Sequence, residues 1–194
     1  MEKDVIEVFV DGLCEPVNPR GVATFGFVVY KDDAKIKVSS GVVDSSNSSN
    51  NVAEYSALIQ VLKFLVDNGF TEERVVVKSD SQLLVFQLNG YYSVNAYRII
   101  PLFRQASNLL KHFRKIKMKW IPREENVEAD ALSRKAYADY WKKHPRLLKN
   151  YSKYLATEKQ KNFMKKLKIQ FPFYVSKREA SRLIGKKLEE LKRR

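Results

Sequence analysis

Apolar and polar residues follow two rhythms in the first half of the chain, and each rhythm predicts one kind of secondary structure. Alternating or continuous apolar runs, typical of β-strands, occupy 5–10, 22–30 and 34–43. Apolar residues then recur at helical spacing over 52–66, and Asn68-Gly69 ends that helix. This region therefore predicts three strands followed by one long helix.

Strand-like and helix-like patterns of apolar residues continue up to residue 141. Two more strands and three more helical segments follow, at 74–80 (strand), 81–90 (helix), 96–113 (helix), 115–121 (strand) and 127–141 (helix). Pro101 limits the first turn of the third helical segment, and Asn126 is placed to cap the last helix.

The resulting order, β-β-β-α-β-α-α-β-α, predicts an α/β fold. Consecutive strands with short connections pair antiparallel, whereas strands joined through a helix lie parallel. We therefore expect a five-stranded mixed sheet flanked by helices, with strands one to three antiparallel and strands one, four and five parallel.

The residues after Pro145 show a pattern of their own. A helix around 157–168 and a second helix capped by Ser176 are separated by a short apolar stretch. Seven apolar residues are candidates for a small core: Phe163, Leu167, Phe171, Phe173, Leu183, Ile184 and Leu188. We predict a domain over 1–141 and a small helical C-terminal module over 142–194, with plain disorder of the tail as the alternative.

The net charge of +14 is concentrated in that module. Residues 1–139 hold 18 Lys/Arg and 18 Asp/Glu, whereas residues 140–194 hold 18 and 4. Such asymmetry favours a polyanionic partner, so we expect the basic tail to contact nucleic acid. The alternatives are a solvated tail with no specific partner and a tail that binds another protein.

Other features limit the class of protein. No run of 18 apolar residues exists, so we expect no membrane span, and the acidic N-terminus does not resemble a secretory signal. Cys14 is the only cysteine, which excludes an intrachain disulfide and favours a reducing compartment. We expect a cytoplasmic protein.

Four acidic residues stand where predicted elements begin or end. Asp11 closes the first strand and Asp80 the fourth, while Glu54 and Asp130 lie in the first turns of two helices. If strands one and four are parallel neighbours, Asp11 and Asp80 emerge together at the carboxyl edge of the sheet. Glu54 and Asp130 can then close over that edge, each favoured by its helix N-terminus.

Four clustered carboxylates would repel one another unless cations lie between them. Oxygen ligands select Mg²⁺ or Mn²⁺, and two such ions about 3.5–4 Å apart can clamp a scissile phosphate. The chain has 22 acidic residues, so a surface or capping role is the better interpretation of any one of the four taken alone.

The residues around the four carboxylates carry more information. They are FVDG at 9–12, NNVAEY at 50–55, SDSQ at 79–82 and WIPREENVEAD at 120–130. In this order and spacing the sequence resembles the type 1 ribonuclease H family over about residues 4–141. The IPREEN variant is most similar to the archaeal and Gram-positive bacterial branch.

The resemblance implies an endonuclease that hydrolyses the RNA strand of RNA–DNA hybrids with two metal ions, leaving 5′-phosphate and 3′-hydroxyl ends. Asp11, Glu54, Asp80 and Asp130 match the metal-binding carboxylates. The substrate contacts would be Cys14, Asn18, Asn50, Asn51 and Gln82, with Ser49-Asn50 on a DNA-strand phosphate. Asn and Gln suit 2′-hydroxyls and base edges, because they both donate and accept hydrogen bonds. Helix capping by Asn50 or Asn51 and a small loop role for Cys14 are the alternatives.

Two departures from the family pattern matter. Many members carry a histidine in the loop before the last aspartate, where this chain has Arg123. An arginine stays protonated and is no general base, but it can hold a phosphate or stabilise developing charge. Its alternative is an exposed loop residue.

Some members also insert a basic protrusion, and this chain instead has GYYSVNAYR at 90–98 with one basic residue. Tyr91 or Tyr92 can still stack on a sugar or base, and the basic tail is expected to supply the missing charge.

Two other functions fit the same fold. One is a non-catalytic module that binds nucleic acid, which the four intact carboxylates argue against. The other is a different nuclease of the superfold, such as a resolvase or integrase, which the SDSQ and NNVAEY contexts argue against. The sequence leaves open whether RNA duplexes or single ribonucleotides in DNA are cut, which metal is preferred, and the oligomeric state.

Overall fold

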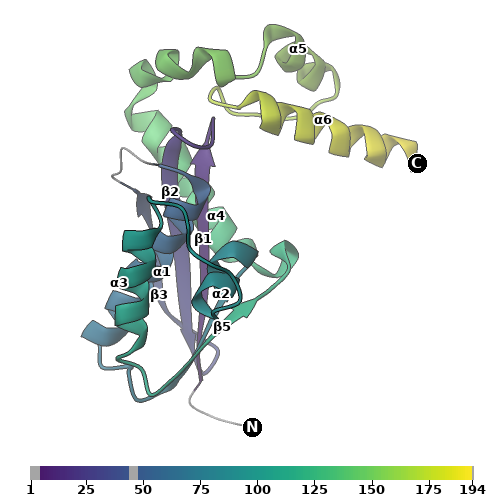
Figure 1. Cartoon of the computed structure of the whole chain (residues 1–194). Coiled ribbons are helices and arrows are strands. Elements are labelled where there is room, and N and C mark those ends of the chain that lie inside the picture. The colour runs from purple at the N-terminus through teal and green to yellow at the C-terminus, as the bar shows by residue number, and fades with distance from the viewer. Residues whose placement is uncertain (1–4, 44–47, 194) are drawn as a thin grey trace.

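The computed structural model describes residues 5–43 and 48–193, and its centre is the expected five-stranded mixed sheet (Figure 1). The strands are β1 (Val5–Glu15), β2 (Val22–Lys31), β3 (Ala34–Val42), β4 (Arg74–Ser79) and β5 (Lys115–Trp120). They lie in the order β3-β2-β1-β4-β5. The pairs β1–β2 and β2–β3 are antiparallel, and β1–β4 and β4–β5 are parallel, as predicted.

Helices cover both faces of the sheet. One face is covered by α1 (Asn50–Asp67), which also packs against α3 (Ile100–Leu110). The other is partly covered by α4 (Val127–Lys143), which contacts β1, β2 and β3. The short α2 (Gln82–Leu88) follows β4, and a 3₁₀ turn (η1, Arg123–Glu125) precedes α4.

The main core lies between the sheet and α1. The even residues of β1, Ile6, Val8 and Val10, are fully buried there, because alternate side chains of a strand point to the same face. Across from them, α1 buries the apolar residues whose helical spacing predicted it, Leu58, Leu62 and Leu65 among them. This packing fixes where the ends of β1 and α1 lie.

Several element boundaries differ from the prediction: the helix predicted over 96–113 is shorter, at Ile100–Leu110, and two other differences bear on the site. The first strand does not end at Asp11 but continues to Glu15, because β2 pairs with it along that whole length. Its parallel pairing with β4 stops at Phe9, so Asp11 still lies beyond the last β4 contact. The first helix begins at Asn50, two residues early, because the Ser49 hydroxyl caps it by accepting a bond from the backbone N–H of Val52.

The C-terminal module, residues 145–193, is folded in the structure. It consists of a 3₁₀ segment η2 (Pro145–Tyr154), α5 (Glu158–Lys166) and α6 (Lys177–Lys192). Thr157 caps α5 with a capping box and Ser176 caps α6, the latter as predicted. An isolated antiparallel β-bridge between Leu155 and Ser176 pairs the segment before α5 with the start of α6.

The small core of the module differs in part from the prediction. Its buried centre is Ala156, Met164, Val175 and Ala180, with Phe171, Leu183 and Ile184 packed against it. The predicted members Phe163, Phe173 and Leu188 are exposed, and Leu167 lies outside the cluster. Met164 packs in the buried centre with Ala180 of α6, so its neighbour Phe163 points outward. The small side chains of Ala156 and Ala180 let α6 and the segment before α5 approach closely.

Aromatic residues join the module to the sheet domain, the name used here for residues 5–143. Trp141, at the end of α4, is fully buried against Val22 of β2 and Tyr137. Tyr151 of η2 and Tyr174 pack edge-on against this pair, with ring centroids 5.6 Å from Trp141 and 5.5 Å from Tyr137 respectively. The helix α4 thus runs two residues past the predicted domain boundary, directly into the junction. Over the described ranges, no helix is long and apolar enough to cross a membrane.

Candidate active site

Four elements bring the predicted carboxylates to one end of the sheet. Asp11 lies in β1 beyond the last pair with β4, and Asp80 directly follows β4. Glu54 lies in α1 and Asp130 in the first turn of α4, on opposite faces of the sheet. We call Asp11, Glu54, Asp80 and Asp130 the carboxylate site.

Two glycines permit the helices to approach this closely. A Cβ atom on Gly12 would collide with the backbone nitrogen of Glu54, so α1 rests directly on β1. A Cβ atom on Gly26, the partner of Asp11 across β1 and β2, would lie 2.6 Å from the Ala129 carbonyl and the Ser133 nitrogen of α4. Each helix therefore carries its carboxylate to the strand backbone without an intervening side chain.

Asp11 is the most buried member of the site, at 8% exposed. The Ser133 hydroxyl donates a hydrogen bond to its Oδ2. Burial, opposed by that bond and assisted by the charges of Asp80 and Asp130, raises the pKa of Asp11 to about 7. A neighbouring cation would favour its charged form.

The pKa of Glu54 is raised for the same reasons as that of Asp11. The Ser81 hydroxyl donates to its Oε2, but burial together with the charges of Asp11 and Asp80 raises the pKa of Glu54 to about 8. The expectation that a helix N-terminus favours its charge is wrong for Glu54. Because α1 begins at Asn50, the carboxylate lies beyond the first turn, where the helix dipole acts most.

Asp80 is held by an amide. The Asn126 side chain donates from Nδ2 to Asp80 Oδ1 over 2.6 Å and to the Val10 carbonyl over 3.0 Å. Asn126 occupies the N-cap position of α4 as predicted, but its side chain does not cap the helix. It instead links the middle of β1 and the end of β4 to the start of α4.

Asp130 is the one carboxylate paired with cations. Arg123 forms an ion pair with its Oδ1, and Arg134 Nε donates to its Oδ2 over 2.7 Å. Burial works against its charge, but the two arginines outweigh burial and lower the pKa of Asp130. Arg123 thus lies at the site and not free in solvent, although 60% of its side chain is exposed.

The donor set suits a divalent cation, although the site is not preassembled. Within the described ranges, no three His, Cys, Asp or Glu side chains are grouped so as to hold a metal ion, and each carboxylate accepts a protein hydrogen bond or ion pair instead. Two of the carboxylates are buried and repel their neighbours, an arrangement that a hard cation relieves. Asn126 Oδ1 is also buried without a donor in this part of the chain.

The predicted substrate residues form a second group beside the site. Asn50 Oδ1 accepts from the Cys14 backbone N–H over 2.6 Å, and the Asn50 N–H donates to Asn18 Oδ1 over 3.0 Å. Asn18 is exposed, Asn51 is half-buried, and Ser49 is buried as the cap of α1. The Cys14 side chain is 3% exposed and packs on Ala23 and Ala53.

Gln82 and the two tyrosines are open to solvent. Gln82 begins α2, next to Asp80 and Ser81. Tyr91 is 76% exposed, and both Tyr91 and Tyr92 set their rings edge-on to Phe86. All these positions remain predictions as substrate contacts.

Sequence reasoning missed four residues that hold the carboxylates: Ser81, Asn126 (seen only as a cap), Ser133 and Arg134. Two of them had a signal. Ser133 and Arg134 stand three and four residues after Asp130, which places them on its face of the helix. Ser81 and Asn126 depend on contacts between distant segments, which spacing does not indicate.

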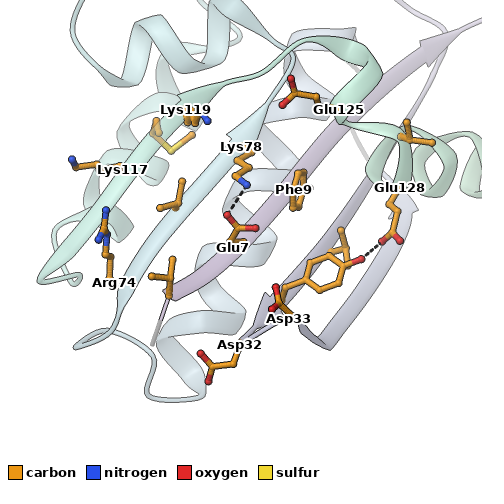
Figure 2. Close-up of a pocket in the computed structure, with 16 residues that line it drawn as sticks. Glu7, Phe9, Asp32, Asp33, Arg74, Lys78, Lys117, Lys119, Glu125 and Glu128 are labelled. Carbon is orange, nitrogen blue, oxygen red and sulfur yellow. Dashed lines mark hydrogen bonds and ion pairs between the residues drawn. The ribbon is translucent and has the colours of Figure 1, made fainter. Parts of the chain in front are cut away.

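A hollow outside the carboxylate site lies on the sheet face beside α4 (Figure 2). Three of the charged side chains that line it are paired: Lys78 with Glu7 over 2.6 Å, and Glu128 with Tyr30 and also with Lys35 outside the hollow. The carboxylate site does not line it.

Comparison with known proteins identifies the family. The model of the reverse transcriptase-like family matches residues 9–136, a range that contains all four carboxylates. The crystal structure of LC11-RNase H1 in complex with RNA/DNA hybrid is 30% identical with a TM-score of 0.64, covering 70% of this chain and 98% of that chain. The chain belongs to the type 1 ribonuclease H family.

Curated relatives of this ribonuclease H-family chain come from archaea and bacteria. Ribonuclease HI of Halobacterium salinarum is 34% identical over 134 residues, which is 69% of this chain and 65% of that protein. The bifunctional protein Rv2228c of Mycobacterium tuberculosis is 37% identical over 119 residues, or 61% of this chain. The matched part of the chain spans about a third of the length of these mycobacterial relatives, 32% for Rv2228c.

Proposed function

We propose that this protein is an endonuclease that hydrolyses the RNA strand of RNA–DNA hybrids, leaving 5′-phosphate and 3′-hydroxyl ends. The observation that carries the proposal is the carboxylate site itself. Four carboxylates, one within β1, one directly after β4 and two on helices, lie at one end of the sheet in a chain of the type 1 ribonuclease H family. A module that only bound nucleic acid would gain nothing from burying these negative charges beside a polyanion.

We assign Asp11, Glu54, Asp80 and Asp130 as the ligands of two divalent cations, Mg²⁺ or Mn²⁺. When bound, these ions activate a water for attack on the phosphate and stabilise the departing 3′ oxygen. The protein's own donors orient the ligands: Ser133 holds Asp11, Ser81 holds Glu54 and Asn126 holds Asp80. Orienting partners of this kind typically matter for metal affinity.

Arg123 is proposed to serve the scissile phosphate. It pairs with Asp130 in the structure, so it is already within the site. A guanidinium that exchanges a carboxylate for a phosphate can stabilise the charge that develops during hydrolysis.

We propose that a group of residues beside the carboxylate site contacts the hybrid. They are Asn18, Asn50, Asn51, Gln82, the Ser49-Asn50 pair, the Cys14 segment and Tyr91. Amide side chains engage 2′-hydroxyls and minor-groove edges, so recognition rests on shape and on the 2′-OH, not on base sequence.

The basic C-terminal module is proposed to add affinity for nucleic acid that does not depend on sequence. Residues 140–194 carry the whole net charge of the chain, most of it on the module, and cations that neutralise phosphates release counterions on binding. The alternative role for the module is binding of a protein partner. Because Cys14 is the only cysteine, which favours a reducing compartment, we also propose a cytoplasmic location.

The test is a cleavage assay with three substrates of one sequence: an RNA–DNA hybrid, an RNA duplex and a DNA duplex. Each is incubated with Mg²⁺, with Mn²⁺ and with EDTA. We expect the hybrid to be cut on its RNA strand with either metal and left intact in EDTA. Binding of the hybrid without any cleavage would favour a non-catalytic module, and cleavage of DNA duplex would favour another nuclease of the superfold.

A further inference from the structure

The helix α6 begins beside the carboxylate site. Figure 1 shows it starting above the β1–β2 end of the sheet and running out past the side of the sheet domain. Residues of its first turns are close enough to the site to interact electrostatically: Arg182 with Asp130, and Glu179 with Arg123 and Arg134. The start of α6, more than 40 residues after Asp130 in the sequence, thus borders the carboxylate site.

The placement of α6 is fixed by packing. Tyr174, two residues before the N-cap Ser176, packs on Tyr137 of α4 in the aromatic junction. Ala180, Leu183 and Ile184 then hold the inner face of α6 against α5 and the segment between the two helices. The opposite face is left to solvent.

That outer face carries a row of cations. Arg178, Arg182 and Lys186 follow one another at a spacing of four residues, which places them on one side of the helix. All three are exposed; Arg182 pairs with Glu179, whereas Arg178 and Lys186 make no hydrogen bond or ion pair within the described residues. We call these three residues the basic stripe, and it ends where Glu189 introduces a negative charge on the same side.

A glycine stands inside this row. Gly185, between Arg182 and Lys186, is helical, and a Cβ atom added there would meet nothing within 4 Å. Glycine in a helix interior is unfavourable by up to about 1 kcal/mol relative to alanine, and no neighbour in the structure requires it. A common reason for such a residue is the close approach of a ligand to the backbone.

From this arrangement we propose that α6 is a duplex-binding arm: Arg178, Arg182 and Lys186 contact phosphates of the hybrid where it leaves the carboxylate site, and Gly185 lets the backbone of the duplex lie against the helix. The proposal rests on the proposed function and deepens it, because it assigns the substrate affinity of the module to one face of one helix. The basic stripe spans about 12 Å along α6, which is enough for roughly three phosphates.

A nucleic acid fits this face better than a protein partner does. The stripe is cationic and carries no large apolar side chain, whereas protein interfaces have an apolar or aromatic centre. It also borders the carboxylate site, which is proposed to hold the same polyanion, because Arg182 of the stripe interacts electrostatically with Asp130.

The test compares two triple variants that each remove three positive charges from the module of the full chain. One is Arg178→Ala/Arg182→Ala/Lys186→Ala in the stripe. The matched control is Lys159→Ala/Lys165→Ala/Lys166→Ala on α5, three exposed lysines outside it. Hybrid affinity is measured for duplexes of about 6, 12 and 18 base pairs across a salt series, and cleavage of the same hybrids is followed with Mg²⁺.

We expect the stripe variant to bind the longest hybrid about 10- to 30-fold more weakly, with a salt slope smaller by about two to three units, because each lost phosphate contact removes about one unit. The loss should shrink with the shortest hybrid, which does not reach the stripe. The α5 control should lose about threefold or less at every length. Gly185→Leu should weaken binding of the long hybrid without lowering the melting temperature.

Equal losses in the two triple variants would overturn the arm, because the module would then act as a diffuse positive charge. Unchanged binding in both would also overturn it. If the stripe variant melts early, Lys186→Ala alone decides, with a loss of about threefold on the long hybrid expected and no loss contradicting the proposal. Failure of the unmodified protein to cut any hybrid would reject the proposed function instead, and is read from the same cleavage assay.

Discussion

The sheet domain and the C-terminal module differ in both charge and packing. The sheet domain has a large continuous core and almost no net charge, and it buries carboxylates that repel one another. The module has four buried residues at its centre and carries the charge excess of the chain. In the proposed function, one region would hold the metal ions and the other would hold the nucleic acid on which those ions act.

The two regions also depend on each other unequally. The sheet domain holds its fold through β-strand pairing and the packing of α1, none of which involves the module. The module relies on Trp141, Tyr137 and the β2 residue Val22 to cover its aromatic residues. Breaking the sheet domain should therefore remove function, whereas altering the module should tune it.

The largest effect is expected at Asp11. Asp11→Asn removes one charged ligand from the carboxylate site, so cleavage of the hybrid should fall to the detection limit. The fold should remain, because Ser133 can donate to the amide oxygen as it does to the carboxylate. Activity at saturating Mg²⁺ and the circular dichroism spectrum are the measurements.

Glu7→Gln is the matched control for this prediction. Glu7 stands on the same strand and the same face, four residues away, and pairs with Lys78 outside the site. It should keep activity within about twofold, since Glu7 lies outside the site and Gln can still accept a hydrogen bond from Lys78. Full activity of the Asp11→Asn protein would exclude Asp11 as a metal ligand.

Removal of the module should give the next largest effect. A chain that ends after His144 keeps Trp141 and all of α4 but loses the basic residues that follow. We expect cleavage to persist, binding to weaken, and the salt dependence of the logarithm of affinity to flatten by about three to four units. Hybrid affinity of both lengths over about 50–300 mM salt measures this.

Equal salt slopes for the two lengths would mean that the module does not touch the nucleic acid. A cut after Tyr140 is a poorer choice, because it also removes Trp141, which is fully buried against Val22. The melting temperatures of both truncated chains should be recorded, since loss of Tyr151 and Tyr174 uncovers the junction.

A smaller effect is expected at Arg123. Arg123→Ala removes a guanidinium from Asp130 and from the proposed scissile phosphate, so turnover should fall about 10- to 100-fold, and more than hybrid binding weakens. Arg104→Ala, an exposed arginine of α3, is the control and should change neither quantity. Turnover within about twofold of the unmodified protein would make Arg123 a loop residue only.

The smallest effect concerns the stability of the module. Gly185→Ala should raise the free energy of unfolding by up to about 1 kcal/mol, because alanine is the better helix former and the added Cβ meets no atom. Chemical denaturation followed by far-ultraviolet circular dichroism measures it. A lower stability would show that Gly185 is needed by the fold, not by a ligand.

Much of the sheet domain could be predicted because its signals are local. The spacing of apolar residues gave α1, and Asn68-Gly69 and Gly90 marked two helix ends where the glycines adopt positive φ. Strand β1 was predicted too short, since the pairing of Glu15 with Val22 depends on a partner and not on local apolar content. In the module, a helix register that buries Met164 in place of Phe163 could not be chosen from sequence alone.

The four carboxylates could be selected from 22 acidic residues because short motifs surround each of them. What surrounds them in space could not be predicted. Asn126 had the pattern of a helix cap, yet its amide crosses to Asp80 and to the Val10 carbonyl. The ion pair between Arg123 and Asp130 depends on how the η1 turn folds back onto α4, which follows from tertiary packing.

One feature of α4 has a consequence for how a duplex would be held. The helix runs without interruption from Asp130 in its first turn to Trp141 in its last, a span of about 16 Å. Domains that bind one ligand together are often joined by flexible linkers, whose length sets the effective concentration of the second domain. Here a stiff helix replaces the linker, so in the proposed function the module would already be in place before a substrate binds. The entropy of ordering it is lost on folding, not on binding.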